Sequence, residues 1–366
     1  MAFATLPPEL LDAIFDPLPA IDLAALAATC SSFTGSADRH LYRHVALASH
    51  ARNLGAVSTL AAHPRLSSLV RTFSLDVDDA DSASQEFYAL LYRALWCMEG
   101  LTSLELNVGI NESWLLKDAS CGHSAKIFPH LQHFASSLIF DHNVVSFLLR
   151  TPSLLSLQLS TSVSPSDVSA MGLPTEAIPK LNSYTGPASL LRHLSPRPLT
   201  TLLLSDDLTL EDVQYLSSSP PPALRAPCQS ASCGENCCAM PPTSVQVLSV
   251  ITSAPPASMI EALAKTCPHL SCLRVMTTCA FWEAPDLSFY TRIAQTLSTL
   301  PALTAFELSG MHWESRPKSP VTGVLEVGEK EWVSPPVTPR IVDVEFQEDH
   351  QDQDFGLNEA FLDWSY

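Results

Sequence analysis

Four cysteines lie close together in the chain, and their thiolates could bind a metal ion. They are Cys228, Cys233, Cys237 and Cys238, within a serine- and proline-rich segment at residues 217–242. Four thiolates can hold zinc in a tetrahedral site. The spacings of four, three and zero residues differ from paired C-x-x-C motifs, and adjacent cysteines chelate poorly. The composition therefore favours a disordered insert over a zinc site, and we expect no metal and no cofactor.

The histidines and nucleophiles of the chain do not predict catalysis. Twelve histidines are scattered through apolar or loop positions, and His123 near Cys121 and His130 near His133 are the closest approaches to a cluster. The sequence contains no nucleophile motif, no phosphate-binding loop and no metal-spaced His-Glu motif. We interpret His130 and His133 as polar residues at the start of a strand and expect no enzymatic activity.

Composition limits the class of protein. With 366 residues, 46% hydrophobic and 16% charged, the chain has enough apolar material for a large core or two domains. The net charge of −18 argues against nucleic-acid binding, which needs clustered cations. No apolar run is long enough to cross a membrane, and the N-terminus does not resemble a secretory signal. We therefore expect reduced cysteines and a location in the cytoplasm or nucleus.

The N-terminal residues predict short helices. Pro7 and Pro8 suit the first turn of a helix, Pro17 should end it, and Asp22 is a plausible N-cap for a second helix. Apolar residues recur between these points at helical spacing on one broad face, namely Leu10, Leu11, Ile14, Phe15 and Leu18. Helices this short are marginal unless they pack on another protein or domain.

The order of these motifs resembles an F-box. The opening Leu6-Pro7-Pro8-Glu9-Leu10-Leu11 is followed by Asp22-Leu23, by Cys30-x-x-Phe33 and by Leu41-Tyr42-Arg43. The resemblance implies that the helices dock on a Skp-type adaptor. It assigns the adaptor contacts to the residues that match the opening motif, namely Leu6, Pro7, Glu9, Leu10, Ile14 and Leu18. Leu23, Leu26 and Phe33 fit adaptor contact or internal packing equally well. In the alternative interpretation, the helices only cap the domain that follows.

A short apolar pattern then recurs along the chain. It reads apolar-x-x-apolar-x-apolar, as in Leu101 to Leu106 and Leu270 to Val275, and prolines before several copies would stop a helix. The copies begin at residues 101, 131, 154, 181, 199, 245, 270 and 303; those at 131 and 181 are the poorest, and Leu66 to Leu75 fits only loosely. Each copy predicts a strand.

The segments between the strands predict helices, including one after a capping box at Ser82 to Gln85 that ends at Gly100. Repeated strand and helix units bury their apolar faces by stacking on one another. The pattern resembles leucine-rich repeats. We therefore expect an α/β fold with a three-helix F-box followed by an irregular leucine-rich-repeat solenoid, or horseshoe.

Alternate residues of each predicted strand should face the open, concave side of the solenoid. Glu105, Gln158, Arg274 and Glu307 occupy such positions and are our candidate substrate-binding residues. A merely solvated face is an equally good interpretation, because neither charge nor aromatic residues cluster there. An alanine at Arg274 should then change stability by less than about 0.5 kcal/mol.

The patterns divide the chain into regions. They are F-box-like helices at residues 1–48, a connecting helix or linker at 49–65, repeats at 66–311 with the insert at 217–242, and a proline-bearing, acidic tail at 312–366. From residue 341 onward the tail has eight acidic residues, no Lys or Arg, and several aromatic residues. It either caps the last repeat, which we favour, or is a short binding motif.

Together these features resemble F-box/LRR substrate receptors of the fungal type. The resemblance implies a non-catalytic subunit that joins a cullin-based ubiquitin ligase through the Skp-type adaptor and holds a protein substrate on its repeats. The competing hypothesis is an interaction scaffold with no link to ubiquitination.

Overall fold

The computed structural model describes residues 6–77, 84–117, 128–160, 173–174, 177–194, 197–216, 245–278, 287–317 and 330–333. These residues belong to one compact unit that spans Met1–Ser334. The second unit, Pro335–Tyr366, lies outside the described residues, as do the four clustered cysteines and the acidic tail from residue 341 onward.

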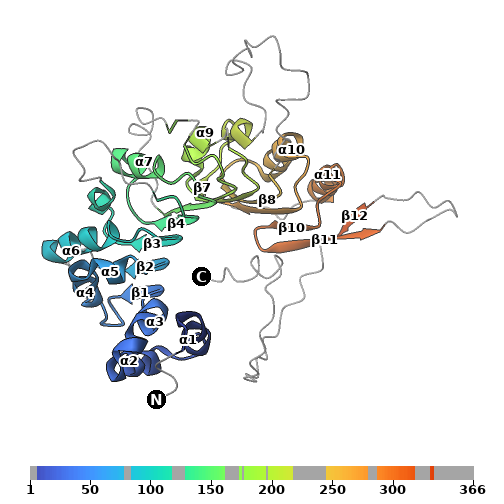
Figure 1. Ribbon diagram of the computed structural model, residues 1–366. Coiled ribbons are helices and arrows are strands. Elements are labelled where there is room, and N and C mark those ends of the chain that lie inside the picture. Colours follow the sequence, from blue (N-terminus) through green and yellow to red (C-terminus); the bar gives the residue numbers. More distant parts are fainter. Residues whose placement is uncertain are drawn as a thin grey trace, which may run out of the picture. The chain divides into compact units, whose positions relative to one another are not determined.

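The described strands form one sheet in which the spatial order follows the chain order (Figure 1). Strands β1 to β10 are all parallel, and β10, β11 and β12 are antiparallel. The strands are β1 His44–Ala48, β2 Thr72–Asp76, β3 Ser103–Asn107, β4 His133–Ser136, β5 Ser156–Leu159, β6 Ser183–Gly186, β7 Thr201–Asp207, β8 Val247–Thr252, β9 Cys272–Thr277, β10 Ala305–Leu308, β11 Met311–Pro317 and β12 Lys330–Val333.

The recurring apolar pattern predicts eight of these strands correctly. Each strand from β3 to β10 begins two residues after a copy of the pattern begins, including the poor copies at residues 131 and 181. The parallel register aligns the second residue of each strand into one buried row across the sheet: Leu104, Phe134, Leu157, Tyr184, Leu202, Leu248, Leu273 and Phe306. This row forms the inner layer of the core.

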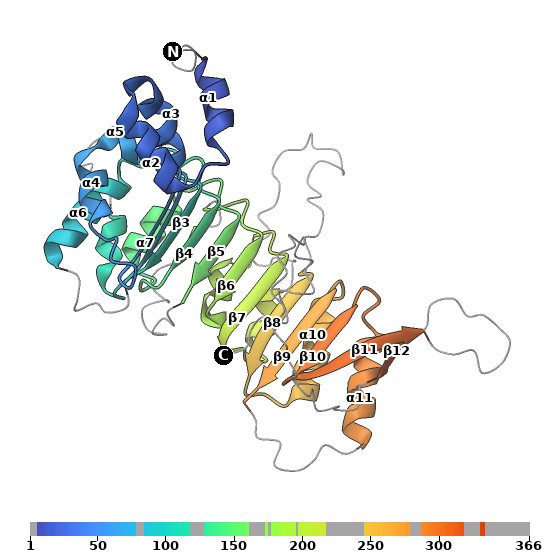
Figure 2. The ribbon, with the colours of Figure 1, turned by 90° about the horizontal axis from the view of Figure 1, so that it is seen from below.

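The helices between the strands cover one face of the sheet. They are α4 Ala56–Ala62, α5 Pro64–Ser67, α6 Gln85–Leu95, α7 His142–Leu148, α9 Leu191–Leu194, α10 Pro256–Thr266 and α11 Leu287–Ser298, with 3-10 turns η2 Glu112–Leu116, η3 Ala188–Leu190 and η4 Asp212–Leu216. Their apolar sides and the inward residues of the strands make one continuous core. Figure 2 shows the other face, which carries none of these helices.

Helix α6 begins later and ends earlier than the pattern predicts. Its N-cap is Ser84, whose hydroxyl accepts a hydrogen bond from the Phe87 amide at 3.3 Å, so the capping box placed at Ser82 was wrong. The helix ends at Leu95 rather than near Gly100. Gly100 has another role, because a Cβ there would lie 1.6 Å from Nη1 of Arg71.

The sheet extends beyond the repeat region predicted from the sequence at both ends. It begins at His44, before residue 66, because β1 pairs in register with β2. After β10, Ser309 and Gly310 adopt φ angles of 47° and 82° and form a two-residue turn into β11. β11 and β12 contribute the buried Trp313 and Trp332, so part of the predicted 312–366 tail belongs to the sheet.

Candidate functional site

The three N-terminal helices have a small hydrophobic core of their own. They are α1 Pro8–Phe15, α2 Ala20–Thr29 and α3 Ser31–Leu41, and α3 packs against both of the others. Leu11, Phe15, Leu23 and Ala37 are buried in a cluster that is separate from the main core. The Phe15 and Phe33 rings meet edge to face, with their centroids 5.9 Å apart.

Prolines set the boundaries of these helices. Pro7 precedes α1, and α1 ends at Phe15, two residues before Pro17, as predicted. The prediction of Asp22 as the N-cap of α2 was wrong, because α2 begins at Ala20 after Pro19. The Pro19 carbonyl accepts hydrogen bonds from the Asp22 and Leu23 amides, which places Asp22 in the first turn of the helix. In that position the positive end of the helix dipole stabilises the Asp22 carboxylate.

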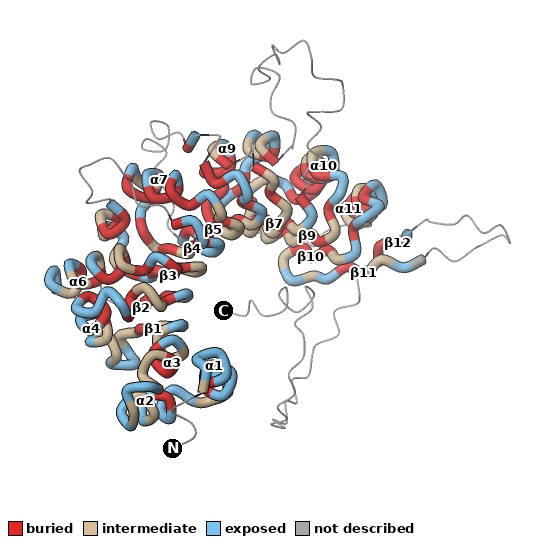
Figure 3. Tube along the Cα trace, viewed as in Figure 1, coloured by how far each residue is buried: buried red, intermediate tan, exposed pale blue. Residues whose placement is uncertain are grey.

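Helix α3 divides the apolar face of α1 into two sides. Leu11 and Phe15 pack in the small core with Ala37 of α3, whereas Leu10 and Ile14 remain 52% and 44% exposed. Figure 3 shows that most of α1 is exposed. Leu10 and Ile14 are four residues apart, so they lie on the same side of α1. Helix α1 is therefore anchored by Leu11 and Phe15 and leaves the two large apolar side chains of Leu10 and Ile14 available to a partner protein.

A third exposed apolar residue, Ile21 in α2, is 78% exposed and was not among the predicted contacts. The sequence did contain a signal for it. Ile21 is off the helical face defined by Leu23, Leu26 and Ala27, all of which pack in or against the small core. A large apolar residue on the exposed side of a short helix is a candidate for a contact with another protein.

The structure places the other predicted adaptor contacts in two kinds of position. Pro7 and Glu9 are exposed. Leu6 and Leu18 are half-buried and pack against the small core. Of the three residues for which internal packing was an equal alternative, Leu23 is buried and Leu26 and Phe33 are half-buried against the same core.

An ion pair fastens α1 to α3. The Arg39 guanidinium donates to both carboxylate oxygens of Asp12, at 2.8 Å from Nη2 to Oδ1 and 3.2 Å from Nε to Oδ2. Burial alone would raise the pKa of Asp12, but the hydrogen bonds from Arg39 and Ser36 outweigh burial and hold the pKa below its ordinary value of 3.8. The paired carboxylate thus favours the folded arrangement of α1 and α3.

Replacing Asp12 with asparagine should lower the thermal midpoint of the chain at pH 7 by on the order of 1 °C, because the pair is partly exposed. A depressed folded pKa contributes stability above the unfolded value of 3.8 that is lost as the pH falls through the folded value. The difference between the two proteins should therefore shrink below about pH 4. Thermal melts from pH 7 to pH 3 measure it, and a difference that stays constant with pH would contradict an electrostatic role.

The helices are also tied to the first units of the sheet. Asp38 of α3, which is buried, forms an ion pair with Arg65 of α5. Tyr42 and Val45, which follow α3, pack against the main core. The exposed residues of α1 are thus carried by helices that are attached to the sheet at the end of α3.

The candidate substrate-binding residues occupy one row on the helix-free face of the sheet. Glu105 in β3, Gln158 in β5, Arg274 in β9 and Glu307 in β10 are connected through strand partners in register. Glu105 and Gln158 are exposed and lie two strands apart. Only Arg274 and Glu307 meet, with Nε and Oε1 3.3 Å apart.

Glu307 differs from what its strand position predicts. Its residue is only 6% exposed, and the Arg274 side chain is 16% exposed. The expectation that these two side chains are freely accessible was therefore wrong. A buried carboxylate needs a partner, and Arg274 supplies the positive charge.

The described residues hold no group of three or more His, Cys, Asp or Glu side chains placed to bind a metal. Cys267 and Cys272 are buried, and burial raises the pKa of the Cys267 thiol to about 12. Among the helices of the described segments, none has the length and apolar character needed to span a membrane.

Comparison with known proteins identifies the N-terminal helices. No curated protein matches the chain. Residues 3–48, which contain α1, α2 and α3 with their exposed apolar residues, match the family model described as F-box-like. The chain therefore carries an F-box-like domain at residues 3–48.

Proposed function

We propose that this protein is the substrate-recognition subunit of a Skp-cullin-F-box ubiquitin ligase. The observation that carries the proposal is the exposed pair Leu10 and Ile14 in a domain that matches the F-box-like model. F-box domains generally bind Skp-type adaptors. The apolar side of α1 offers such an adaptor a surface that the chain itself leaves exposed.

The sheet supplies the second part of the proposed function. Its parallel strands follow the chain order, helices cover one face, and the pattern of buried residues repeats from strand to strand, which supports an assignment as leucine-rich repeats. Half-buried apolar residues lie on the helix-free face of β7, β8 and β9, namely Leu203, Val247, Ile251 and Met276. Together with the polar Glu105 and Gln158, this face offers a mixed surface to a protein target.

In this proposal the protein carries out no chemical step. The F-box-like helices bind the adaptor, the adaptor binds the cullin, and the sheet holds the target near the ubiquitin-charged enzyme. Holding two reactants together raises their effective concentration and so the rate of transfer. The position of Leu10 and Ile14 on helices attached to the sheet suits this role.

Size-exclusion chromatography of the full chain mixed with a purified Skp-type adaptor tests the proposal. We expect the two proteins to elute together as a complex. The competing hypothesis of an interaction scaffold outside the ubiquitin system predicts separate elution. It is supported by the same sheet face, but it gives no reason for the exposed pair on α1.

A further inference from the structure

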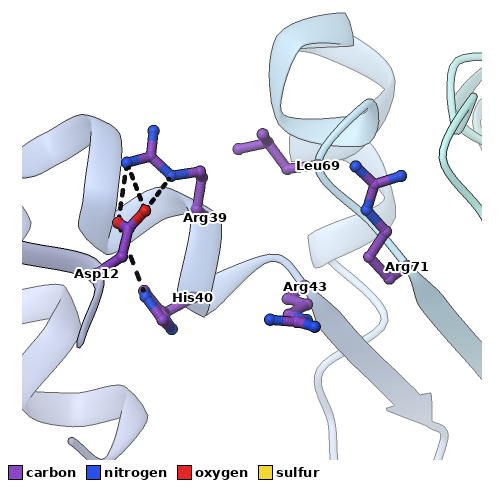
Figure 4. A pocket seen from close by; sticks show the side chains of 6 residues that line it. All are labelled: Asp12, Arg39, His40, Arg43, Leu69 and Arg71. Carbon is purple, nitrogen blue, oxygen red and sulfur yellow. Dashed lines mark hydrogen bonds and ion pairs between the residues drawn. The ribbon is translucent and has the colours of Figure 1, made fainter. Parts of the chain in front are cut away.

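A cavity of about 320 Å³ lies where the N-terminal helices meet the first two strands. Its lining combines Asp12 of α1, Arg39 and His40 of α3, and the residues Arg43, Leu69 and Arg71 around the starts of β1 and β2. Figure 4 shows Asp12, Arg39 and His40 together, Arg71 on the opposite side, and Arg43 between them. The volume is at the lower end of the range for small-molecule sites.

The parallel sheet places two of these arginines side by side. Arg43 directly precedes β1, Arg71 directly precedes β2, and the Arg71 amide donates a hydrogen bond to the Arg43 carbonyl at 2.8 Å. Adjacent strands lie about 4.8 Å apart, so the two guanidinium groups emerge from neighbouring backbone positions. An anion bound between the two positive charges would offset their mutual repulsion.

The charges already present leave this cavity positive. Asp12 is engaged by Arg39, and the ring of His40 lies 3.9 Å from Asp12 and 3.8 Å from Asp16. The Arg43 side chain has no hydrogen bond or ion pair within the described segments. Three arginines and one aspartate give a charge of about +2 in a chain whose formal charge is −18.

Arg71 is held in position by a contact that requires glycine. Its Nη1 donates to the Gly100 carbonyl at 2.8 Å, and any side chain at residue 100 would occupy the place of the guanidinium. Within the described segments the Arg71 guanidinium makes no other hydrogen bond, so its remaining N–H groups can donate to a ligand. A fixed guanidinium loses less freedom on binding than a mobile one, which favours binding at this position.

We propose that this cavity binds the phosphoryl group of a small phosphate compound through Arg43 and Arg71. A phosphoryl group carries a charge of about −1.5 to −2 at pH 7, which matches the uncompensated charge of the cavity better than a single carboxylate does. Arginine offers paired N–H donors in the geometry that suits phosphate oxygens. The ligand would bridge the F-box-like helices and the sheet.

Isothermal titration calorimetry of the full chain with inorganic phosphate, pyrophosphate and malonate at one ionic strength tests this proposal. Fixed ionic strength is needed because salt screens such contacts. We expect the phosphate compounds to bind and Arg43→Gln to weaken that binding about tenfold or more. The control is Arg93→Gln, which removes the same charge from an exposed position on α6 and should change binding less than about twofold.

A phosphoserine peptide distinguishes the source of the phosphoryl group. Tighter binding of pyrophosphate than of the peptide supports a free small compound, whereas the reverse order would overturn that part of the proposal. Equal binding of malonate, or an equal effect of Arg43→Gln and Arg93→Gln, would overturn the phosphate site itself. Arg71→Gln provides a second test should Arg43→Gln fail to fold, and an unchanged affinity in that variant would likewise contradict the site.

Discussion

Replacing Leu10 and Ile14 together with alanine should weaken binding of a Skp-type adaptor on the order of a hundredfold. Each substitution removes three carbon atoms, and a buried methylene contributes about 0.8 kcal/mol. Because each residue is about half exposed in the free protein, roughly half of that sum, or about 2.4 kcal/mol, is gained only in the complex. Since 1.4 kcal/mol corresponds to tenfold, the expected loss approaches a hundredfold. Surface plasmon resonance with immobilised adaptor measures it.

The chain offers a matched control for this experiment. Ile110 and Leu149 are also large apolar residues, each 50% exposed, and both lie outside the F-box-like domain. Their double replacement by alanine removes the same six carbon atoms and should leave adaptor binding within about twofold of the unmodified protein. Equal affinities of the two double variants, with both still folded, would contradict the assignment of α1 as the adaptor-binding surface.

Most strands of the sheet could be predicted because the apolar pattern within each strand matches the residues that the strand buries in the core. Each of the eight copies of the apolar-x-x-apolar-x-apolar pattern identified from residue 101 onward begins two residues before a parallel strand. β1 follows the same spacing, at Tyr42, Val45 and Leu47, but these residues were assigned to the F-box-like region, so the strand was missed. The hairpin of β11 and β12 carries no copy of the pattern that we identified. β11 depends on a tight turn at Ser309 and Gly310.

The candidate site was only partly predictable, because side-chain exposure depends on neighbouring elements. Helical spacing groups Leu10, Leu11, Ile14 and Phe15 on one face, and only the position of α3 shows which two remain exposed. The same limit applies to strand alternation. It places Glu105 and Glu307 on one face of the sheet, yet Glu105 is exposed and Glu307 is buried.

The burial of Glu307 reverses the expected result for its partner. Arg274→Ala should lower the free energy of unfolding by about 3 kcal/mol, because it leaves a buried carboxylate unpaired. The alternation of side chains along the strand, taken alone, would place Arg274 on the surface and predicts a change in the free energy of unfolding of less than about 0.5 kcal/mol. Leu273 is the neighbouring residue in β9 and belongs to the buried row. Leu273→Ala serves as the comparison and should lower the free energy of unfolding by about 2 to 5 kcal/mol. Urea denaturation of the three proteins measures these differences.

A double variant separates the unpaired charge from lost packing. Arg274→Ala with Glu307→Gln removes the arginine stem and both charges, and it should recover most of the stability that Arg274→Ala alone loses. A double variant as unstable as Arg274→Ala would show that packing by the arginine stem is what matters. A stable Arg274→Ala beside an unstable Leu273→Ala would show that Glu307 is accessible to water. In that case Arg274 and Glu307 would again be available to a target. If the two side chains are buried together, polar contacts with a target are restricted to Glu105 and Gln158 at the other end of the row.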